Sequence, residues 1–286
     1  MIKKKEARVG SFLKWKLGYN TNGFQSHRLK DALWIIKEIG YQSVALTLDH
    51  CHLDPLFATQ KEIQEVADFF SHYGLDCYIE TGGRYLLDPW KKHYPSLVSE
   101  GWQRRIEVLK KSIEIGSQLK AKGITIFSGK SFSQEEVPLL YDRLIQGIEI
   151  LLREVEGTGM TLALEPEPGM VVECLTDYLY VKELGGFQDL KLTMDLGHVW
   201  CIEKIPISQA LHGYASEIMH LHIEDIKGKE HVHLPFGRGD MPFESIFKTL
   251  NKIGPAFPIH VELSRSSHEA PKVAKEAYEF LTSHLK

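Results

Sequence analysis

MTLALEPEPG, residues 160–169, is the stretch from which the fold can be read. A short apolar run of the kind that forms a buried strand ends in Glu165, and a loop rich in proline and glycine follows at once. The same pattern, an apolar run with an acidic residue or a histidine at or near its end, occurs three more times downstream. Those runs are LKLTMD (190–195), IMHLHIE (218–224) and PIHVEL (258–263). The second half of the chain therefore predicts repeated strands that end in polar side chains.

Four similar runs precede this stretch, and helix-period segments separate them. The runs are KWKLGYN (14–20), VALTLD (44–49), DCYIE (76–80) and ITIFSG (124–129). In HRLKDALWIIKEIG (27–40) the apolar residues recur every three to four positions, and Gly40 marks a helix end. GWQRRIEVLKKSIEIGSQLKAKG (101–123) has the same character and is expected to end at Gly123. Further helices are expected at 60–73, 134–156, 175–184, 206–216, 242–253 and 268–285.

Eight strands that alternate with eight helices predict an α/β protein with a parallel sheet. Eight such units close most naturally as a single (β/α)₈ TIM barrel, which fills about 250 residues as one domain. We expect this barrel to occupy residues 14–286 of the 286-residue chain, with residues 1–13 as an N-terminal extension. An open, doubly wound sheet is the alternative that the pattern leaves.

The composition is that of an ordinary globular enzyme. Apolar residues make up 43% and charged residues 25%, and 34 basic against 38 acidic residues give a net charge of −4. This balance argues against a nucleic-acid partner. No window is apolar enough for a membrane helix, and the start, MIKKKEARVG, is not a secretory signal. The four cysteines form no CxxC motif, so we expect a reducing, cytoplasmic location and no thiolate zinc site.

The polar residues at the strand ends carry the functional prediction. Side chains alternate along a strand, so each of these residues shares a face with a small or polar neighbour two positions earlier. The pairs are Glu165 with Ala163, Asp195 with Thr193, His222 with His220, and Glu262 with His260. The positions between them are apolar and would face the helices, so the four polar side chains should point inward at the barrel mouth.

Three carboxylates and one imidazole cannot gather unpaired in a dry pocket. A divalent cation resolves this, and the oxygen-rich donor set suits Mn²⁺, Mg²⁺, Co²⁺ or Zn²⁺. The sequence therefore predicts one divalent metal ion held by Glu165, Asp195, His222 and Glu262. An ordinary polar barrel core built from Glu–His and Asp–Lys pairs is the simpler alternative.

A second group of imidazoles should lie beside this site. His198 follows Asp195 by three residues, and His231 and His233 follow the strand at 218–224. The three histidines could bind a second, zinc-like ion or contact substrate hydroxyls. The long loop TGGRYLLDPWKKHYPSLVSEG (81–101), with Arg84, is expected either to cover a polar ligand or to pack on the surface.

These motifs resemble the xylose isomerase-like TIM barrel superfamily, which includes sugar phosphate isomerase/epimerase-like proteins and AP endonuclease family 2. The resemblance covers about residues 14–285. Its most specific pieces are ALEPEPG (163–169), TMDLGH (193–198), HLHIED (220–225), FGRGDMPF (236–243) and HVELS (260–264).

The resemblance implies metal ligands at Glu165, Asp195, His222 and Glu262, with Glu165 and Glu262 also as the catalytic acid/base pair. In the epimerase branch one glutamate removes a proton next to a carbonyl and the other returns it, through a metal-stabilised enediolate. His198 matches a substrate-contacting histidine. Further substrate contacts are expected from Lys227, Glu167, Arg84 and His50. Lys227 stands where that branch has an arginine.

We therefore expect a divalent-metal-dependent isomerase or epimerase of a small sugar or polyol-derived carbonyl compound. Its partner is expected to be a small sugar-like substrate, and the chain can form a homo-oligomer. An inosose-type dehydratase begins with the same proton abstraction. A zinc-dependent hydrolase resembling endonuclease IV would need a multinuclear site. For that site His50 or His52 could serve, but the stretch ETGGRY (80–85) lacks the expected histidine.

Overall fold

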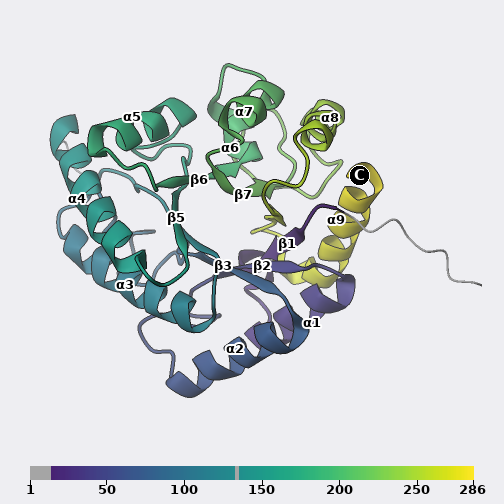
Figure 1. Ribbon diagram of the computed structural model, residues 1–286, viewed down its shortest axis with the longest axis horizontal. Coiled ribbons are helices and arrows are strands. Elements are labelled where there is room, and N and C mark those ends of the chain that lie inside the picture. The colour runs from purple at the N-terminus through teal and green to yellow at the C-terminus, as the bar shows by residue number, and fades with distance from the viewer. Residues whose placement is uncertain (1–13, 133–134) are drawn as a thin grey trace, which may run out of the picture.

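The computed structural model describes residues 14–132 and 135–286, so the extension expected at residues 1–13 lies outside the described residues. Eight parallel strands close into a barrel in chain order, with the helices around them (Figure 1). The predicted (β/α)₈ barrel is confirmed. The strands are β1 (Leu17–Asn20), β2 (Ser43–Thr47), β3 (Asp76–Glu80), β4 (Gly123–Ile126), β5 (Thr161–Leu164), β6 (Lys191–Asp195), β7 (Ile218–Ile223) and β8 (Ile259–Val261).

The helices follow the strands in chain order, as in Figure 1. They are α1 (Leu29–Ile39), α2 (Gln60–Tyr73), α3 (Trp102–Gln118), α4 (Val137–Val155), α5 (Leu175–Gly185), α6 (Leu196–Ile202), α7 (Ile207–Tyr214), α8 (Phe243–Ile253) and α9 (Ala270–His284), with short 3₁₀ turns η1 (Thr21–Phe24) and η2 (Ser267–Glu269). None of these described helices is both long and apolar enough to cross a membrane.

Local signals set several of these boundaries. Gly40 ends α1 in the left-handed region, at φ +115°, which favours glycine. Thr59 and Glu62 form a reciprocal capping box that begins α2. The apolar stripe of α1 is buried at Leu33 and Ile36, so helical period, cap and burial agree.

One boundary prediction was wrong, and one helix was not predicted. α3 ends at Gln118, and Gly123 is the first residue of β4. A β-carbon at Gly123 would lie 2.1 Å from Sδ of Met219, so that glycine permits close packing. The short helix α6 was not predicted. It begins where the Oδ1 atom of Asp195 accepts a hydrogen bond from the backbone N–H of His198.

The barrel interior below the mouth is polar. His260 Nε2 lies 2.8 Å from Ser43 Oγ, His260 Nδ1 lies 3.0 Å from His220 Nδ1, and His220 Nε2 lies 2.9 Å from Thr125 Oγ1. Each neutral imidazole supplies one donor and one acceptor, so this chain is satisfied without charge. Burial lowers the pKa of both histidines well below the usual value. The network fixes the inner face of β7 and β8, on which the site is built.

Candidate metal and substrate site

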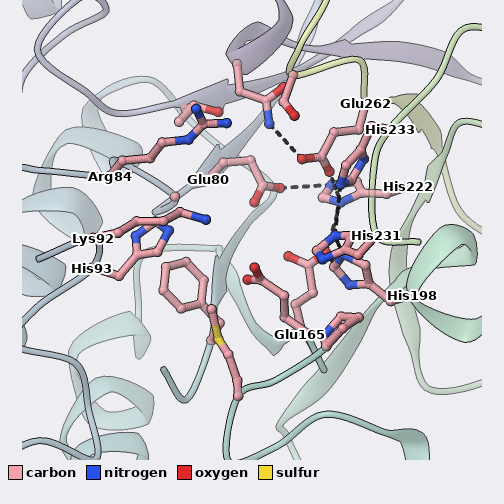
Figure 2. Close-up of a pocket in the computed structure, with 18 of the residues that line it drawn as sticks. Glu80, Arg84, Lys92, His93, Glu165, His198, His222, His231, His233 and Glu262 are labelled. Carbon is pink, nitrogen blue, oxygen red and sulfur yellow. Dashed lines mark hydrogen bonds and ion pairs between the residues drawn. The ribbon is translucent and has the colours of Figure 1, made fainter. Parts of the chain in front are cut away.

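A cavity of about 430 Å³ opens at the C-terminal ends of the strands. This is where the chemistry of (β/α)₈ barrels is found. Its walls carry carboxylates and imidazoles on one side and cations on the other (Figure 2). The charged and imidazole residues that line it are Glu80, Arg84, Lys92, His93, Lys130, Glu165, Glu167, His198, His222, His231, His233, Glu262 and Arg265.

Four of the predicted metal ligands do come together. One donor atom from each of Glu165, Asp195, His222 and Glu262 lies within 4.8 Å of the others. They sit at the ends of β5, β6, β7 and β8, and the registers bring these ends to one rim: Asp195 pairs with His222, and His222 with His260. The inward orientation expected from strand alternation is therefore what the structure has.

The ring of His222 presents one nitrogen to the carboxylates. Its Nδ1 atom lies 2.9 Å from Glu262 Oε2 and 3.2 Å from Glu165 Oε1, and 3.9 Å from Asp195 Oδ2. Its Nε2 atom faces Glu80 Oε1 at 3.3 Å (Figure 2). A carboxylate behind the second ring nitrogen fixes the tautomer and orientation of a metal-ligating histidine. Nδ1 is thus the nitrogen that faces the three carboxylates, and Glu80 lies within ion-pair distance of Nε2 on the other side of the ring.

Asp195 leaves one oxygen free for a ligand. Its Oδ1 atom caps α6, while its buried Oδ2 atom has no hydrogen-bond partner among the described residues. A buried carboxylate oxygen without a partner is costly unless something else satisfies it. The donor set, three carboxylates with one imidazole, therefore fits a divalent cation that prefers oxygen and nitrogen ligands.

The charges of the site are out of balance without a cation. Burial raises the pKa of Glu165 well above its usual value, although the positive His222 works against this shift. Burial alone would raise the pKa of Glu262. The positive charges of His222 and His233 have the larger effect and hold the pKa of that carboxyl far below the usual range. The carboxylates in turn raise the pKa of His222 well above normal despite its burial. The positive charge of the His222 imidazolium balances the carboxylates here, as the charge of a metal ion would.

The second predicted cluster is also assembled. His231 Nε2 lies 2.9 Å from His198 Nε2 and 3.1 Å from His233 Nε2. The Nδ1 atom of His198 is 2.9 Å from the carbonyl oxygen of Pro166 and can only donate there, so its Nε2 lone pair faces the other imidazoles. Three nitrogen atoms that converge in this way could hold a second ion or bind hydroxyl groups.

Glu224 is a buried carboxylate that the sequence analysis did not single out. It is fully buried, its Oε2 atom lies 3.7 Å from His233 Nδ1, and neither oxygen has a hydrogen-bond partner among the described residues. Burial, with Asp195 nearby, raises its pKa to about 8, and Glu224 in turn helps raise the pKa of His233 to about 10. The alternation in HLHIE, with Glu224 two residues after His222, was the signal that could have found it.

The predicted substrate contacts divide into two groups. Glu167 and Arg84 line the cavity, as does His198. Lys227 and His50 are exposed and are absent from the cavity wall that the described residues form. His50 Nδ1 instead lies 2.6 Å from Asp54 Oδ2, and His52 Nε2 lies 3.1 Å from the carbonyl oxygen of His27. The structure therefore gives neither Lys227 nor His50 the position expected for a substrate contact.

Several lining residues were not among the predicted site residues, because they come from irregular segments, although the loop 81–101 was expected as a possible cover for a polar ligand. Lys92 and His93 lie on the loop 81–101, Lys130 follows β4 and Arg265 follows β8. Asn22 donates a 2.7 Å hydrogen bond from Nδ2 to Glu262 Oε1. Polar residues in irregular segments carry no periodic signal, so only the folded chain shows which of them face the cavity.

Comparisons with known proteins agree with this fold. A family model described as "Xylose isomerase-like TIM barrel" matches residues 33–284. "Uncharacterized protein MJ1614" of Methanocaldococcus jannaschii is 25% identical over 52% of this chain and 57% of its own length. "Putative L-ribulose-5-phosphate 3-epimerase UlaE" of Shigella dysenteriae is 23% identical over 59% of this chain and 60% of its own length. The chain thus spans less than two thirds of either relative.

Solved structures share the fold over most of the chain. The 3-keto-D-glucoside 4-epimerase YcjR of E. coli superposes with a TM-score of 0.76 and 16% identity, and the match covers 94% of this chain and all of that one. The IOLI protein, solved with a bound zinc atom, gives a TM-score of 0.74 and 16% identity over 95% of this chain and 99% of that one.

Proposed function

Because the chain belongs to the xylose isomerase-like TIM barrel family, we propose that it is a divalent-metal-dependent isomerase or epimerase of a small sugar-like carbonyl compound. The observation that carries the proposal is the convergence of Glu165, Asp195, His222 and Glu262 at the mouth of the barrel. The resemblance to proteins named as sugar epimerases supports the substrate class. Four free cysteines among the described residues fit the cytoplasmic location that we also propose.

Glu165, Asp195, His222 and Glu262 would hold the cation, which supplies Lewis-acid polarisation of the substrate carbonyl when bound. Glu165 and Glu262 reach the cavity from β5 and β8 and would be the proton-transfer pair. One carboxylate takes the proton from the carbon next to the carbonyl, and the other returns a proton to carbon. Asn22 orients Glu262 through its hydrogen bond to Oε1. His198 and Glu167 would position hydroxyl groups.

Solvent exchange tests the proton-transfer role of Glu262. In D₂O the metal-loaded protein should place deuterium on the carbon next to the carbonyl of its substrate, read by NMR across a panel of ketoses and inososes. Glu262→Gln should lower this exchange by at least about 10²-fold, because glutamine cannot accept the proton. Gln Oε1 can still accept the Asn22 hydrogen bond, so the fold should be unchanged.

The matched control is Glu269→Gln, which removes an exposed carboxylate from the same β8–α9 connection. Its exchange rate should equal that of the wild type. Normal exchange by the Glu262→Gln protein would overturn the proposed mechanism. A dehydratase would show the same proton abstraction together with loss of water from the substrate.

A hydrolase is the second candidate, favoured by one observation, the convergence of His198, His231 and His233 beside the first site. Hydrolysis needs an activated water, and a second ion on these imidazoles would support it. Elemental analysis of protein purified without added metal or chelator separates the two functions. About one ion per chain favours the isomerase or epimerase, and two or more zinc ions favour the hydrolase.

A further inference from the structure

We propose that the cavity binds the terminal phosphate of a phosphorylated sugar at a cationic subsite formed by Arg84, Lys92, Lys130 and Arg265. This inference rests on the proposed function, because it names the substrate class of the same cavity. The four residues, called the cationic subsite below, all line the cavity. They come from three different loops, those after β3, β4 and β8, so the fold and not a local sequence run gathers them.

Two members of the cationic subsite, Arg84 and Lys92, face the proposed metal ligands across the cavity (Figure 2). Arg84 and Lys92 extend into the cavity from one side, and His222, His231 and His198 stand on the other, with Glu80 and Glu165 between (Figure 2). The cavity is therefore negative where the cation would bind and positive at the opposite wall. A molecule that matches both ends of the cavity has oxygen atoms that can coordinate the cation at one end and an anionic group at the other.

The cations lie close enough to repel one another. Burial lowers the pKa of Lys92, the carboxylate of Glu167 opposes the shift, and the charges of Arg84, Lys130 and Arg265 lower the pKa further. The Lys130 ammonium lies beside Gly169, since a β-carbon there would be 3.3 Å from Nζ, so Lys130 reaches the loop that carries Glu167. Four positive charges that converge in this way are stabilised when an anion binds among them.

These charges have few partners within the protein. Among the described residues, no ion pair within 4.0 Å involves any member of the cationic subsite. Other lysines and arginines of the barrel surface do have such partners, for example Arg143 with Glu135 and Lys110 with Glu154. Lys92, Lys130 and Arg265 are exposed and Arg84 is partly buried, so what sets these four cations apart from other unpaired surface cations is that they line one cavity.

The number of charges selects a phosphate monoester over a carboxylate. A phosphate monoester carries about −1.5 to −2 charges at pH 7 and three acceptor oxygens, whereas a sugar carboxylate carries one charge. Two arginines offer planar donor pairs and two lysines offer point charges, and together they match a dianion with three oxygens. The cavity volume of about 430 Å³ is in the range of small-ligand sites.

The loop that supplies Arg84 and Lys92 is held in place by its own packing. The backbone N–H of His93 donates a 2.7 Å hydrogen bond to the carbonyl oxygen of Arg84. Leu86 and Leu87 pack with Val108 in a small apolar cluster. A β-carbon at Gly83 would lie 2.7 Å from the carbonyl oxygen of Leu48, so the loop also sits tightly against the end of β2. The backbone that carries Arg84 and Lys92 is therefore held in place by these contacts.

Calorimetric binding of unreactive ligands tests the subsite separately from catalysis. Ribitol 5-phosphate, ribitol and ribonate all lack an aldehyde or ketone group, so none can turn over, and their dissociation constants are measured with the metal-loaded protein. We expect ribitol 5-phosphate to bind at least about tenfold more tightly than ribitol or ribonate, because charge-assisted hydrogen bonds are the stronger class. Equal affinity for phosphate and alcohol would overturn the proposal, and ribonate binding as tightly as the phosphate would replace it with a sugar acid.

Single substitutions then test which residues are responsible for the preference for phosphate. Lys92→Met and Arg265→Met should each reduce the affinity for ribitol 5-phosphate about tenfold and leave the affinity for ribitol unchanged. Lys91→Met is the matched control, because Lys91 is exposed like Lys92 but contacts the ring of Tyr94 and is absent from the described cavity wall. It should bind like the wild type. A Lys91→Met loss as large as that of Lys92→Met would overturn the assignment.

The two proposals fail in different ways. Phosphate-dependent binding without deuterium exchange from any phosphorylated ketose would leave the cationic subsite standing and remove the isomerase function. Exchange confined to unphosphorylated sugars would leave the isomerase function standing and remove the subsite.

Discussion

At the scale of single residues, Asp195 shows how one side chain serves both fold and site. One carboxylate oxygen caps α6 and so fixes His198 three residues later, while the other oxygen is buried, has no hydrogen-bond partner in the part of the chain that the structure describes, and faces His222. Capping and the proposed metal ligation would use different lone pairs of the same group, so they would not compete. The TMDLGH motif thus encodes a helix start, the position of the His198 imidazole and a candidate metal ligand together.

His93 makes the stability of the protein depend on pH. It is only 8% exposed, and burial, together with the positive Lys92 and Arg105, lowers its pKa to about 3. The unfolded chain binds a proton near pH 6.5 and the folded chain does not, so stability is full above that pH and falls as the pH drops toward the folded value. Between pH 7 and pH 5 the loss from this residue is about 2 kcal/mol.

His93→Asn should remove that part of the pH dependence. Asparagine is neutral and tolerates the left-handed backbone of this position, where φ is +60°. Urea unfolding at pH 7 and pH 5 measures the difference, and the drop in the free energy of unfolding should be about 2 kcal/mol smaller than in the wild type. His268→Asn, at an exposed histidine, should keep the wild-type drop. An unchanged drop in His93→Asn would contradict the prediction.

At the scale of elements, the barrel closes where β1 meets β2 and β8, and Gly18 allows this close approach. A β-carbon at Gly18 would lie 2.2 Å from Cδ2 of His260 and 2.9 Å from the carbonyl oxygen of Ser43. The His260 ring cannot move aside easily, because it is buried and bonded to Ser43 and His220. The missing side chain is therefore a condition for closing the barrel over its polar interior.

Gly18→Ala should lower the free energy of unfolding by about 1–3 kcal/mol, the usual effect of overpacking in a tight core. Gly213→Ala is the matched control. Gly213 lies in α7 with nothing within 4 Å of its added β-carbon, so alanine there should be neutral or slightly stabilising. Denaturant unfolding compares the two. A neutral Gly18→Ala would show that the β1–β8 contact is looser than the structure indicates.

At the scale of the whole molecule, a cation at the mouth would tie four strands together. The four proposed ligands come from the ends of β5, β6, β7 and β8, which span half of the barrel, so metal binding there would be linked to global stability. At a free metal concentration 100 times the dissociation constant, the gain is about 2.7 kcal/mol. Chelation should therefore lower Tm by about 5–10 °C, and Mn²⁺ or Zn²⁺ should restore it.

Asp195→Asn makes this test specific. Asparagine can still cap α6 through its side-chain oxygen, but it removes one negative ligand, so most of the metal-dependent rise in Tm should disappear while the metal-free Tm stays near that of the wild type. Differential scanning calorimetry with and without chelator gives both values. A full metal-dependent shift in Asp195→Asn would count against Asp195 as a ligand.

The barrel and the four polar residues at the strand ends, Glu165, Asp195, His222 and Glu262, could be predicted from the amino-acid sequence alone. Both follow from regular patterns, because the strand and helix periods are local and strand alternation fixes which side chains point inward. Helix ends that depend on packing could not be predicted in this way. Gly123 resembles a helix C-cap in the sequence, but in the structure it begins β4 and permits the close approach of Met219.

Only the tertiary structure decided which loop residues reach the cavity. Lys92, Lys130 and Arg265 lie far apart along the chain and follow no period, and Lys92 differs from its neighbour Lys91 only in the direction that the folded loop gives it. Lys227 and His50 had plausible places in the sequence and lie outside the described cavity wall. The physical reason is that a regular strand repeats one geometry, whereas a loop takes its path from long-range contacts.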